Sequence, residues 1–125
     1  MFELTIIVDF EAAHCIRDYP GKCSRLHGHN WKVEVLVKGN KLNKLGMLID
    51  FRDLKEEVNK VILTLDHYYL NETEAFKEIN PTAENIAKYI YHELAGCSVF
   101  AEDIKVCAIK VWESSHSAVS YSQEA

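Results

Sequence analysis

The sequence lacks the features that would mark a membrane, secreted or repeat protein. No segment approaches the roughly 18 unbroken apolar residues of a membrane-spanning helix, and no internal repeat or low-complexity stretch interrupts the 125 residues. The first residues have no basic start and lead into no small-residue cleavage site, so they do not resemble a secretory signal. We therefore expect a cytoplasmic protein that does not span a membrane. One domain over residues 1–125 is predicted, because a chain of this length closes a single core.

An excess of basic residues is also absent. The formal net charge is −5, which argues against a nucleic-acid partner, because such proteins use a basic stripe to displace counterions from phosphates. One local exception lies in residues 15–29, where Arg17, Lys22 and Arg25 stand against a single acid, Asp18. We expect this basic segment to suit a small anionic ligand.

The four cysteines are even in number, but a reducing compartment and a core of this size make disulfides unnecessary. We predict free thiols. Cys97 follows a predicted helix end and Cys107 lies in a β-branched run, so both are expected to be small buried apolar residues without chemistry.

Alternation of apolar and polar residues predicts strands near both ends of the chain. Trp31, Val33, Val35 and Val37 would share one face of a strand. The connection between the first two strands, residues 13–29, is long, and long connections often carry function. The predicted strands span residues 4–10, 31–38, 104–113 and 118–121.

Two amphipathic helices are predicted in the middle of the chain. Asp50 would cap the first, and an apolar stripe would continue it to near Asp66. Pro81 and Thr82 would begin the second, and Gly96 would end it. The order strand, strand, helix, helix, strand, strand predicts an α+β fold, with both helices on one face of a four-stranded antiparallel sheet. Because the other face and the edge strands would stay open, we expect a homo-oligomer.

Three histidines and one cysteine near the start of the chain give the strongest functional signal. His27 and His29 would leave the same face of an extended segment, and an antiparallel partner could bring His14 across to them. Three imidazole ligands leave one position of a zinc ion open, as in catalytic sites. The alternative is a closed structural site in which Cys23 is the fourth ligand, and spacing alone does not exclude it.

Two further positions carry weaker signals. Asp66 and His67 could form an acid–base pair in which the carboxylate orients the imidazole, or His67 could simply end a helix, where the dipole favours it. Glu113, near the end of a strand, could accept two hydrogen bonds from a planar amino–imino group of a ligand. It could equally be a solvated strand end.

The candidate residues lie in five segments that run nearly the length of the chain: FEAAH (10–14), CSRLHGH (23–29), LDH (65–67), NPTAEN (80–85) and WE (112–113). Together these segments resemble the successive motifs of the 6-pyruvoyltetrahydropterin synthase family. The three-residue gap between Cys23 and His27 resembles the queuosine-pathway branch, the 6-carboxytetrahydropterin synthases, whereas the pyruvoyl enzymes usually have a longer gap there.

The resemblance implies a tunnelling fold, in which trimers join their sheets into a barrel and two trimers stack as a homo-hexamer with active sites between subunits. It also implies a role for each candidate residue. His14, His27 and His29 would hold Zn²⁺, and Cys23 would be the proton-abstracting thiolate. Asp66 and His67 would relay protons. The pterin would be bound by Glu113, Thr82 and Ala83.

The implied reaction converts 7,8-dihydroneopterin triphosphate to 6-carboxy-5,6,7,8-tetrahydropterin, with release of acetaldehyde and triphosphate, for queuosine or deazapurine biosynthesis. Arg17, Lys22 and Arg25 are candidates for neutralising the triphosphate, from their charge and neighbourhood alone. Two alternatives remain open. The protein could eliminate triphosphate only, giving 6-pyruvoyltetrahydropterin, or it could be a non-catalytic, zinc-stabilised pterin-binding module in which Cys23 ligates the metal.

Overall fold

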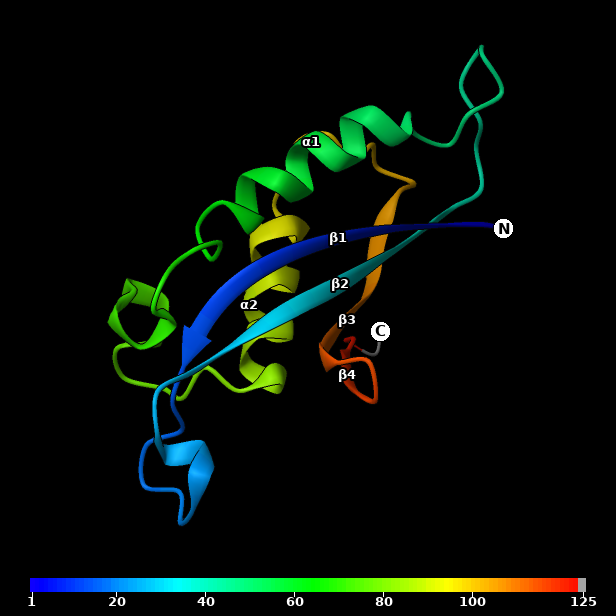
Figure 1. Cartoon of the computed structure of the whole chain (residues 1–125). Coiled ribbons are helices and arrows are strands. Elements are labelled where there is room, and N and C mark those ends of the chain that lie inside the picture. Colours follow the sequence, from blue (N-terminus) through cyan, green and yellow to red (C-terminus); the bar gives the residue numbers. More distant parts are fainter. Residues whose placement is uncertain (124–125) are drawn as a thin grey trace.

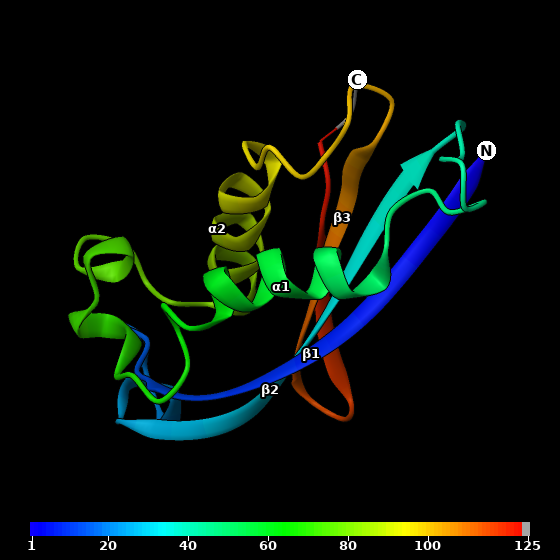
Figure 2. The same cartoon turned by 90° about the horizontal axis from the view of Figure 1, so that it is seen from above.

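A computed structural model describes residues 1–123 of the chain, and for Cys23 the backbone alone. It contains a four-stranded antiparallel sheet in the order β1-β2-β3-β4 and two α-helices (Figure 1). Seen from above, both helices lie on the same side of the curved β1–β2 ribbon (Figure 2). The predicted α+β fold is confirmed. Its elements are β1 (Phe2–His14), β2 (His27–Gly39), α1 (Phe51–Ile62), α2 (Ala83–Ala95), β3 (Lys105–Ser114) and β4 (Ser117–Tyr121).

The first two strands form a ribbon that is longer than the sequence predicts. Its register runs without a break from Phe2 opposite Gly39 to His14 opposite His27. The predicted strands stopped short because Ala12, Ala13 and Gly28 have weak strand propensity, whereas the ladder hydrogen bonds of the partner strand carry the pairing through them. The connection is correspondingly shorter, residues 15–26.

The core lies between the sheet and the two helices. Trp31, Val33, Val35 and Val37 are all 0% exposed, which confirms that they share the inner face of β2. Helix α1 presents Leu54, Val58, Val61 and Ile62 to this core. Alternation then places the even-numbered residues of β1 and the odd-numbered residues of β2 on the helix-covered face.

The helix boundaries follow their caps. Asp50 accepts a hydrogen bond from the amide of Arg52, and Thr82 accepts one from the amide of Asn85, so both predicted N-caps are confirmed. Gly96 is the C-cap of α2, as predicted. Helix α1 ends at Ile62 rather than near Asp66, because the amides of Thr64 and Leu65 bond to carbonyls only three residues back, at Val61 and Ile62.

The cysteine predictions hold in part. Cys15, Cys97 and Cys107 are free, among the cysteines whose side chains the structure describes. Cys97 and Cys107 are half-buried rather than buried. Cys107 is the extra residue of a β-bulge, because Leu36 pairs with Ala108 and the next residue of β2 already pairs with Val106. A bulged residue leaves the regular inward alternation, so it does not reach the core.

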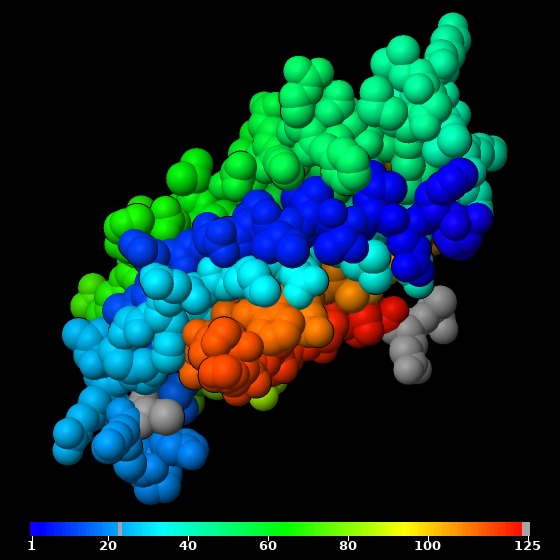
Figure 3. All heavy atoms as spheres, turned by 45° about the vertical axis from the view of Figure 1, so that its right-hand side comes forward, coloured from blue at the N-terminus to red at the C-terminus, as the bar shows by residue number. Residues whose placement is uncertain are grey.

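No helix within residues 1–123 covers the outer face of the sheet. Figure 3 shows the four strands side by side along this face, with α1 only at its margin. Trp112 lies here between the ammonium groups of Lys32 and Lys110, which are 4.5 and 4.8 Å from the indole ring centroid, and its indole N–H is bonded to Glu34. Closure of this face by other copies of the chain stays a prediction. None of the helices in residues 1–123 is long and apolar enough to cross a membrane.

Candidate metal centre and adjacent proton-transfer pair

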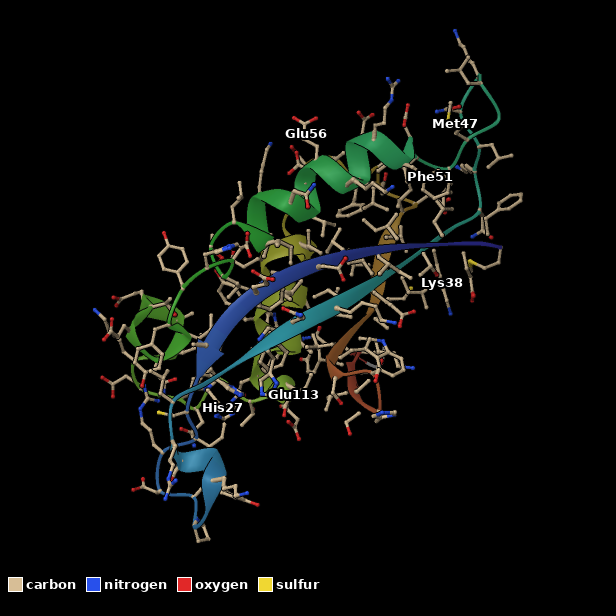
Figure 4. The ribbon with its side chains drawn as sticks, in the orientation of Figure 1. His27, Lys38, Met47, Phe51, Glu56 and Glu113 are labelled. Carbon is tan, nitrogen blue, oxygen red and sulfur yellow. The ribbon has the colours of Figure 1, made fainter. Side chains whose placement is uncertain are left out.

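Three imidazole rings meet where β1 ends and β2 begins. One of them, His27, is labelled in Figure 4. His14 lies directly opposite His27 in the register, and His29 follows two residues later on the same face. The ring centroids are 4.5 Å apart for His14 and His27, 5.1 Å for His14 and His29, and 4.8 Å for His27 and His29. One ligand nitrogen from each ring lies within 4.8 Å of the other two. The structure thus brings the three predicted ligands together.

Main-chain carbonyls fix which nitrogen is available on two of the three rings, those of His14 and His27. Nδ1 of His14 lies 2.7 Å from the carbonyl oxygen of Pro81, and Nδ1 of His27 lies 2.7 Å from that of Arg25. A carbonyl only accepts hydrogen bonds, so each Nδ1 carries the hydrogen and each Nε2 presents a lone pair. This arrangement, a backbone oxygen behind the ring and a free nitrogen in front, is typical of metal-binding histidines.

Two of the free nitrogens are buried without a partner. Nε2 of His14 and Nε2 of His29 are both inaccessible to solvent, and neither has a hydrogen-bond partner within the described part of the chain. A buried polar atom left unpaired costs free energy, so such atoms in a folded protein call for an explanation. Coordination of a cation by the three rings supplies one, and the donor set of three imidazoles fits zinc.

The environment favours the neutral, ligating form of the rings. Burial lowers the pKa of His14, and the neighbouring imidazoles lower it further, while the hydrogen bond to Pro81 opposes them. Burial also lowers the pKa of His29, with Glu113 acting in the opposite direction. Neutral imidazole is the form that binds metals, so these shifts favour metal binding at neutral pH.

Trp31 forms the floor under the histidines. Its ring contacts His14 and His29 edge-on, with centroids 5.1 and 5.2 Å away, and it stacks on Phe10. The indole N–H donates to the carbonyl of Ala12, 3.3 Å away, which satisfies the one polar atom of a buried side chain. A large, fixed aromatic surface below the rings limits the rotamers that His14 and His29 can adopt.

Glu113 reaches the same cluster from β3. Its Oε1 lies 3.5 Å from Nε2 of His29, longer than a good hydrogen bond, and its side chain is 40% exposed. Glu113 is the unpaired residue of a second bulge, between Trp112 opposite Ala118 and Ser114 opposite Ser117. Figure 4 shows it beside His27. The sequence reasoning thus placed Glu113 at the site, while its role as a pterin anchor stays a prediction.

The predicted Asp66–His67 pair also forms. Nδ1 of His67 lies 3.0 Å from Oδ1 of Asp66. The same carboxylate oxygen accepts a hydrogen bond from the amide of Glu11, 2.9 Å away. That amide, followed by the contact with His67, lowers the pKa of Asp66 although burial opposes it. Asp66 is therefore an ionised acceptor that orients the imidazole, and the relay role of the pair stays a prediction.

The pair lies on the outer edge of β1. His67 is not at a helix end, as the alternative had it, but in the turn beyond α1, with a φ of 63°. Its amide donates to the carbonyl of Glu11, and the amide of Ala13 donates to the carbonyl of Tyr68, so this turn lies along the edge of β1, where Tyr69 forms an isolated parallel bridge with Ala13. A shallow hollow joins the pair to the ends of β1 and β2, and its lining includes Glu11, Ala13, Gly28, Asn30, His67 and Tyr68.

The other predicted contacts lie around the start of α2 and in the connection. Thr82 caps α2, and the next residue, Ala83, is buried. Both directly follow Pro81, whose carbonyl contacts His14. Lys22 and Arg25 are exposed. Cys23 lies in the 3-10 turn Lys22–Ser24, but its side chain is outside the described part of the chain, so its role as base or as fourth ligand stays a prediction.

Arg17 has a structural role that charge alone did not suggest. Its guanidinium donates to the carbonyls of Asn71, Phe76 and Ile79 at 3.1, 2.7 and 3.0 Å. Its amide and carbonyl are paired with the side chain of Asn80, at 2.8 and 3.2 Å. The predicted phosphate contact by Arg17 therefore competes with three carbonyl acceptors within the chain.

Sequence reasoning missed two groups of residues at this site. Asn71 holds the backbone of Cys15 by two hydrogen bonds, as Asn80 holds that of Arg17, and together they dock the segment after His14 onto the loop before α2. Glu11 was inside a recognised motif, but nothing marked its contact with His67. Asn71 had no local signal, because its partners are 56 residues away in the sequence.

Comparison with known proteins places the chain in one family. A family model described as 6-pyruvoyl tetrahydropterin synthase matches residues 3–124. The 6-carboxy-5,6,7,8-tetrahydropterin synthase of Haemophilus influenzae is 32% identical over 145 residues, covering 98% of this chain and 100% of its own. A protein of Archaeoglobus fulgidus, provisionally assigned the same name, is 49% identical over 90 residues, covering 72% of this chain and 73% of its own. The solved structure of Caenorhabditis elegans 6-pyruvoyl tetrahydropterin synthase matches with a TM-score of 0.85 at 26% identity, over 98% of this chain and 96% of that chain.

Proposed function

The chain belongs to the 6-pyruvoyl tetrahydropterin synthase family, and from that premise we propose that it is a zinc-dependent 6-carboxy-5,6,7,8-tetrahydropterin synthase. Its substrate would be 7,8-dihydroneopterin triphosphate, and it would release acetaldehyde and triphosphate, with a product destined for queuosine or a related deazapurine. Relatives at 49% and 32% identity that carry the carboxy name support this branch. The observation that carries the proposal is the convergence of three imidazoles, two of which, His14 and His29, have a buried nitrogen without a hydrogen-bond partner among the described residues.

His14, His27 and His29 would hold the zinc ion, His14 and His27 through the nitrogen that is not bonded to a carbonyl and His29 through its buried, unpartnered Nε2. When bound, the ion supplies a Lewis acid that polarises oxygens of the substrate side chain. The protein's own contribution is preorganisation. The carbonyls of Pro81 and Arg25 orient the rings of His14 and His27, and the ring of Trp31 packs against His14. Such fixed ligands lose little entropy on binding the ion.

Cys23 would abstract a proton from the substrate side chain, and Asp66 with His67 would relay protons. A free thiol is scarcely ionised at pH 7, so the base needs positive charge near its sulfur. Asp66 would keep the imidazole of His67 in one tautomer, with Nδ1–H directed to the carboxylate and Nε2 available for exchange. Proton transfer of this kind typically contributes about 10² to 10⁴ in rate.

Glu113 would anchor the pterin by accepting from its planar amino–imino edge, with Thr82 and Ala83 lining the approach at the start of α2. Its 40% exposed carboxylate beside His29 leaves an oxygen free for such a contact. Lys22 and Arg25 are the better candidates for the triphosphate, because the Arg17 guanidinium already has three carbonyl partners.

We further propose that the single 1–125 domain works as a homo-hexamer, a dimer of trimers with active sites between subunits. The open outer face of the sheet and the free edge strands support this assembly, because a monomer would leave them uncovered. The exposed position of His67, away from the inward-facing ligand histidines, also suits a residue that serves a site completed by a second subunit.

The test is incubation with 7,8-dihydroneopterin triphosphate, with the product identified by mass and acetaldehyde assayed separately. Acetaldehyde together with a carboxy product supports the proposal. Triphosphate release with a pyruvoyl product would instead establish the second candidate, 6-pyruvoyltetrahydropterin synthase, which the similarity to the Caenorhabditis elegans structure favours. No turnover by the zinc-loaded protein would leave a pterin-binding module.

A Cys23→Ala variant separates the enzyme from the module. If Cys23 is the base, the variant keeps one zinc per chain and its fold, and it loses turnover. If Cys23 is the fourth ligand of a structural site, the variant loses zinc, and the fold is lost with it. A Cys97→Ala variant is the matched control, because Cys97 is half-buried in the turn after α2, remote in sequence from the histidines.

A further inference from the structure

We propose that Glu11 is a positioning residue for His67, holding the imidazole ring from the nitrogen opposite the one that Asp66 contacts. The inference rests on the proposed function, in which His67 moves a proton, and it adds a third member to the Asp66–His67 pair. Glu11 has no other assigned role, although it lies three residues before the ligand His14.

Two carboxylates bracket one imidazole. Oδ1 of Asp66 lies 3.0 Å from Nδ1 of His67, and Oε2 of Glu11 lies 3.4 Å from Nε2. A single contact at Nδ1 leaves the ring free to swing about that contact. Because both carboxylates only accept hydrogen bonds, the bracket holds the ring in the protonated state of the proton-transfer cycle, when both nitrogens donate. In that state the contact with Glu11 fixes the plane of the ring and the direction of Nε2–H.

The backbone sets up this bracket. The amide of Glu11 donates to Oδ1 of Asp66, and its carbonyl accepts from the amide of His67, so the main chain of Glu11 holds both members of the pair. Strand alternation places Glu11 on the outer face of β1, opposite to His14, and therefore on the side where the pair is exposed. His67 has a φ of 63°, a conformation that a non-glycine residue keeps only where its surroundings determine it.

Exposure decides what kind of role this contact can have. The side chains of His67 and Glu11 are 72% and 63% exposed. An ion pair between such exposed groups contributes little to folding stability, because water screens it. The contact therefore matters for where Nε2 points during turnover rather than for holding the fold together. Replacing Glu11 should leave stability unchanged and lower turnover, the reverse of a core mutation.

The experiment compares Glu11→Ala and Glu11→Gln with Asp9→Ala as the matched control, because Asp9 is an exposed acid on the same strand and face. Glu11→Ala is expected to lower kcat about tenfold with KM unchanged, since misorientation of a proton-transfer group acts on the chemical step. Glu11→Gln, which keeps the length of the side chain, should lose less. Asp9→Ala should match the unmodified protein, and a tenfold loss there would overturn the assignment to Glu11.

A double-mutant cycle separates positioning from a general effect. In a His67→Asn background, Glu11→Ala should cause no further loss of kcat, because the group it positions is gone. Additive losses would overturn the proposal. Nitrogen-15 NMR of the His67 ring gives a second readout: Glu11→Ala should move the Nε2 resonance and leave the Nδ1 resonance, which reports the contact with Asp66. An unmoved Nε2 resonance would also overturn it.

These readouts distinguish the failure of this proposal from the failure of the proposed function. If the unmodified protein turns over and Glu11→Ala is fully active, the enzyme assignment stands and Glu11 has no positioning role. If the unmodified protein shows no turnover, the proposed function fails, and the NMR comparison alone decides whether Glu11 holds the ring.

Discussion

The three-histidine cluster and the Asp66–His67 pair lie at the same end of β1, yet the protein builds them in opposite ways. The cluster is on the inner face, with His14 1% exposed, and main-chain carbonyls hold the rings of His14 and His27. The pair is on the outer edge, with His67 72% exposed, and carboxylates hold its ring. The same side chain thus serves two environments within one small domain.

The difference shows how environment assigns chemistry to histidine. Burial and the neighbouring imidazoles lower the pKa of His14 and His29 and so favour their neutral form, and carbonyl partners orient the rings of His14 and His27, which suits a cation. Exposure and acidic partners on the outer edge suit a ring that exchanges protons with a bound molecule. Each prediction below tests whether these two regions act independently.

Replacing His14 with alanine should have the largest effect. The variant removes a buried ligand, so we expect loss of stoichiometric zinc and a fall in turnover of about 10³ or more, because the Lewis-acid contribution of a catalytic metal is several kcal/mol. Zinc per chain is measured by elemental analysis and turnover by acetaldehyde release. His92→Ala is the control, since His92 is an exposed histidine of α2. Retention of one zinc per chain by His14→Ala would contradict the assignment of the metal site.

Replacing His67 with asparagine should lower turnover about a hundredfold while leaving zinc content unchanged. Asparagine is chosen because it tolerates the left-handed backbone that His67 adopts, with a φ of 63°. Circular dichroism and zinc analysis check that fold and metal are intact. If this variant loses zinc as well, the two regions form one unit and do not act independently.

Local physics explains why much of the fold is predictable from the sequence. Asp50 and Thr82 satisfy the first amides of their helices whatever lies around them, and Gly96 ends α2 for an equally local reason. The alternation of apolar residues from Trp31 to Val37 was correctly interpreted because only one face of this strand is buried, and alternation is the pattern of such a strand. The three ligand histidines were predictable because strand periodicity and one antiparallel register suffice to bring them together.

What the sequence did not reveal depends on partners far along the chain. The positive charge of Arg17 suggested an anion, but the fold supplies it with carbonyls 54 to 62 residues away. The contact of Glu11 with His67 likewise requires the turn after α1 to dock on the free edge of β1. No pattern within a single element encodes either contact, because each arises only when two separate segments meet.

Replacing Asn80 with alanine should weaken zinc binding about tenfold, a typical cost of losing support behind a metal ligand. The side chain of Asn80 holds the backbone of Arg17 by two hydrogen bonds. The next residue, Pro81, provides the carbonyl that orients His14. The variant should also be destabilised by about 1 to 3 kcal/mol, because the amide and carbonyl of Arg17 lose their partners. Chelator competition measures the zinc affinity, and Asn59→Ala, at an exposed position of α1, is the control. Equal zinc affinity in both variants would separate this loop from the metal site.

The smallest expected effect is on the pH dependence of the zinc-free protein. Burial lowers the pKa of His14 and His29 from the ordinary 6.5, so as pH falls the unfolded chain takes up these protons before the folded one. Stability from this source is therefore fully present above about pH 6.5 and is lost as the pH falls toward the lowered folded-state pKa values. Asp66, whose pKa is lowered from 3.8, acts in a separate window at lower pH. Urea titrations between about pH 8 and pH 5 should show the loss, and a His14→Gln variant should show less of it. A flat curve would mean that the inner rings are as hydrated as His67, and the contrast between the two regions would then rest on geometry alone.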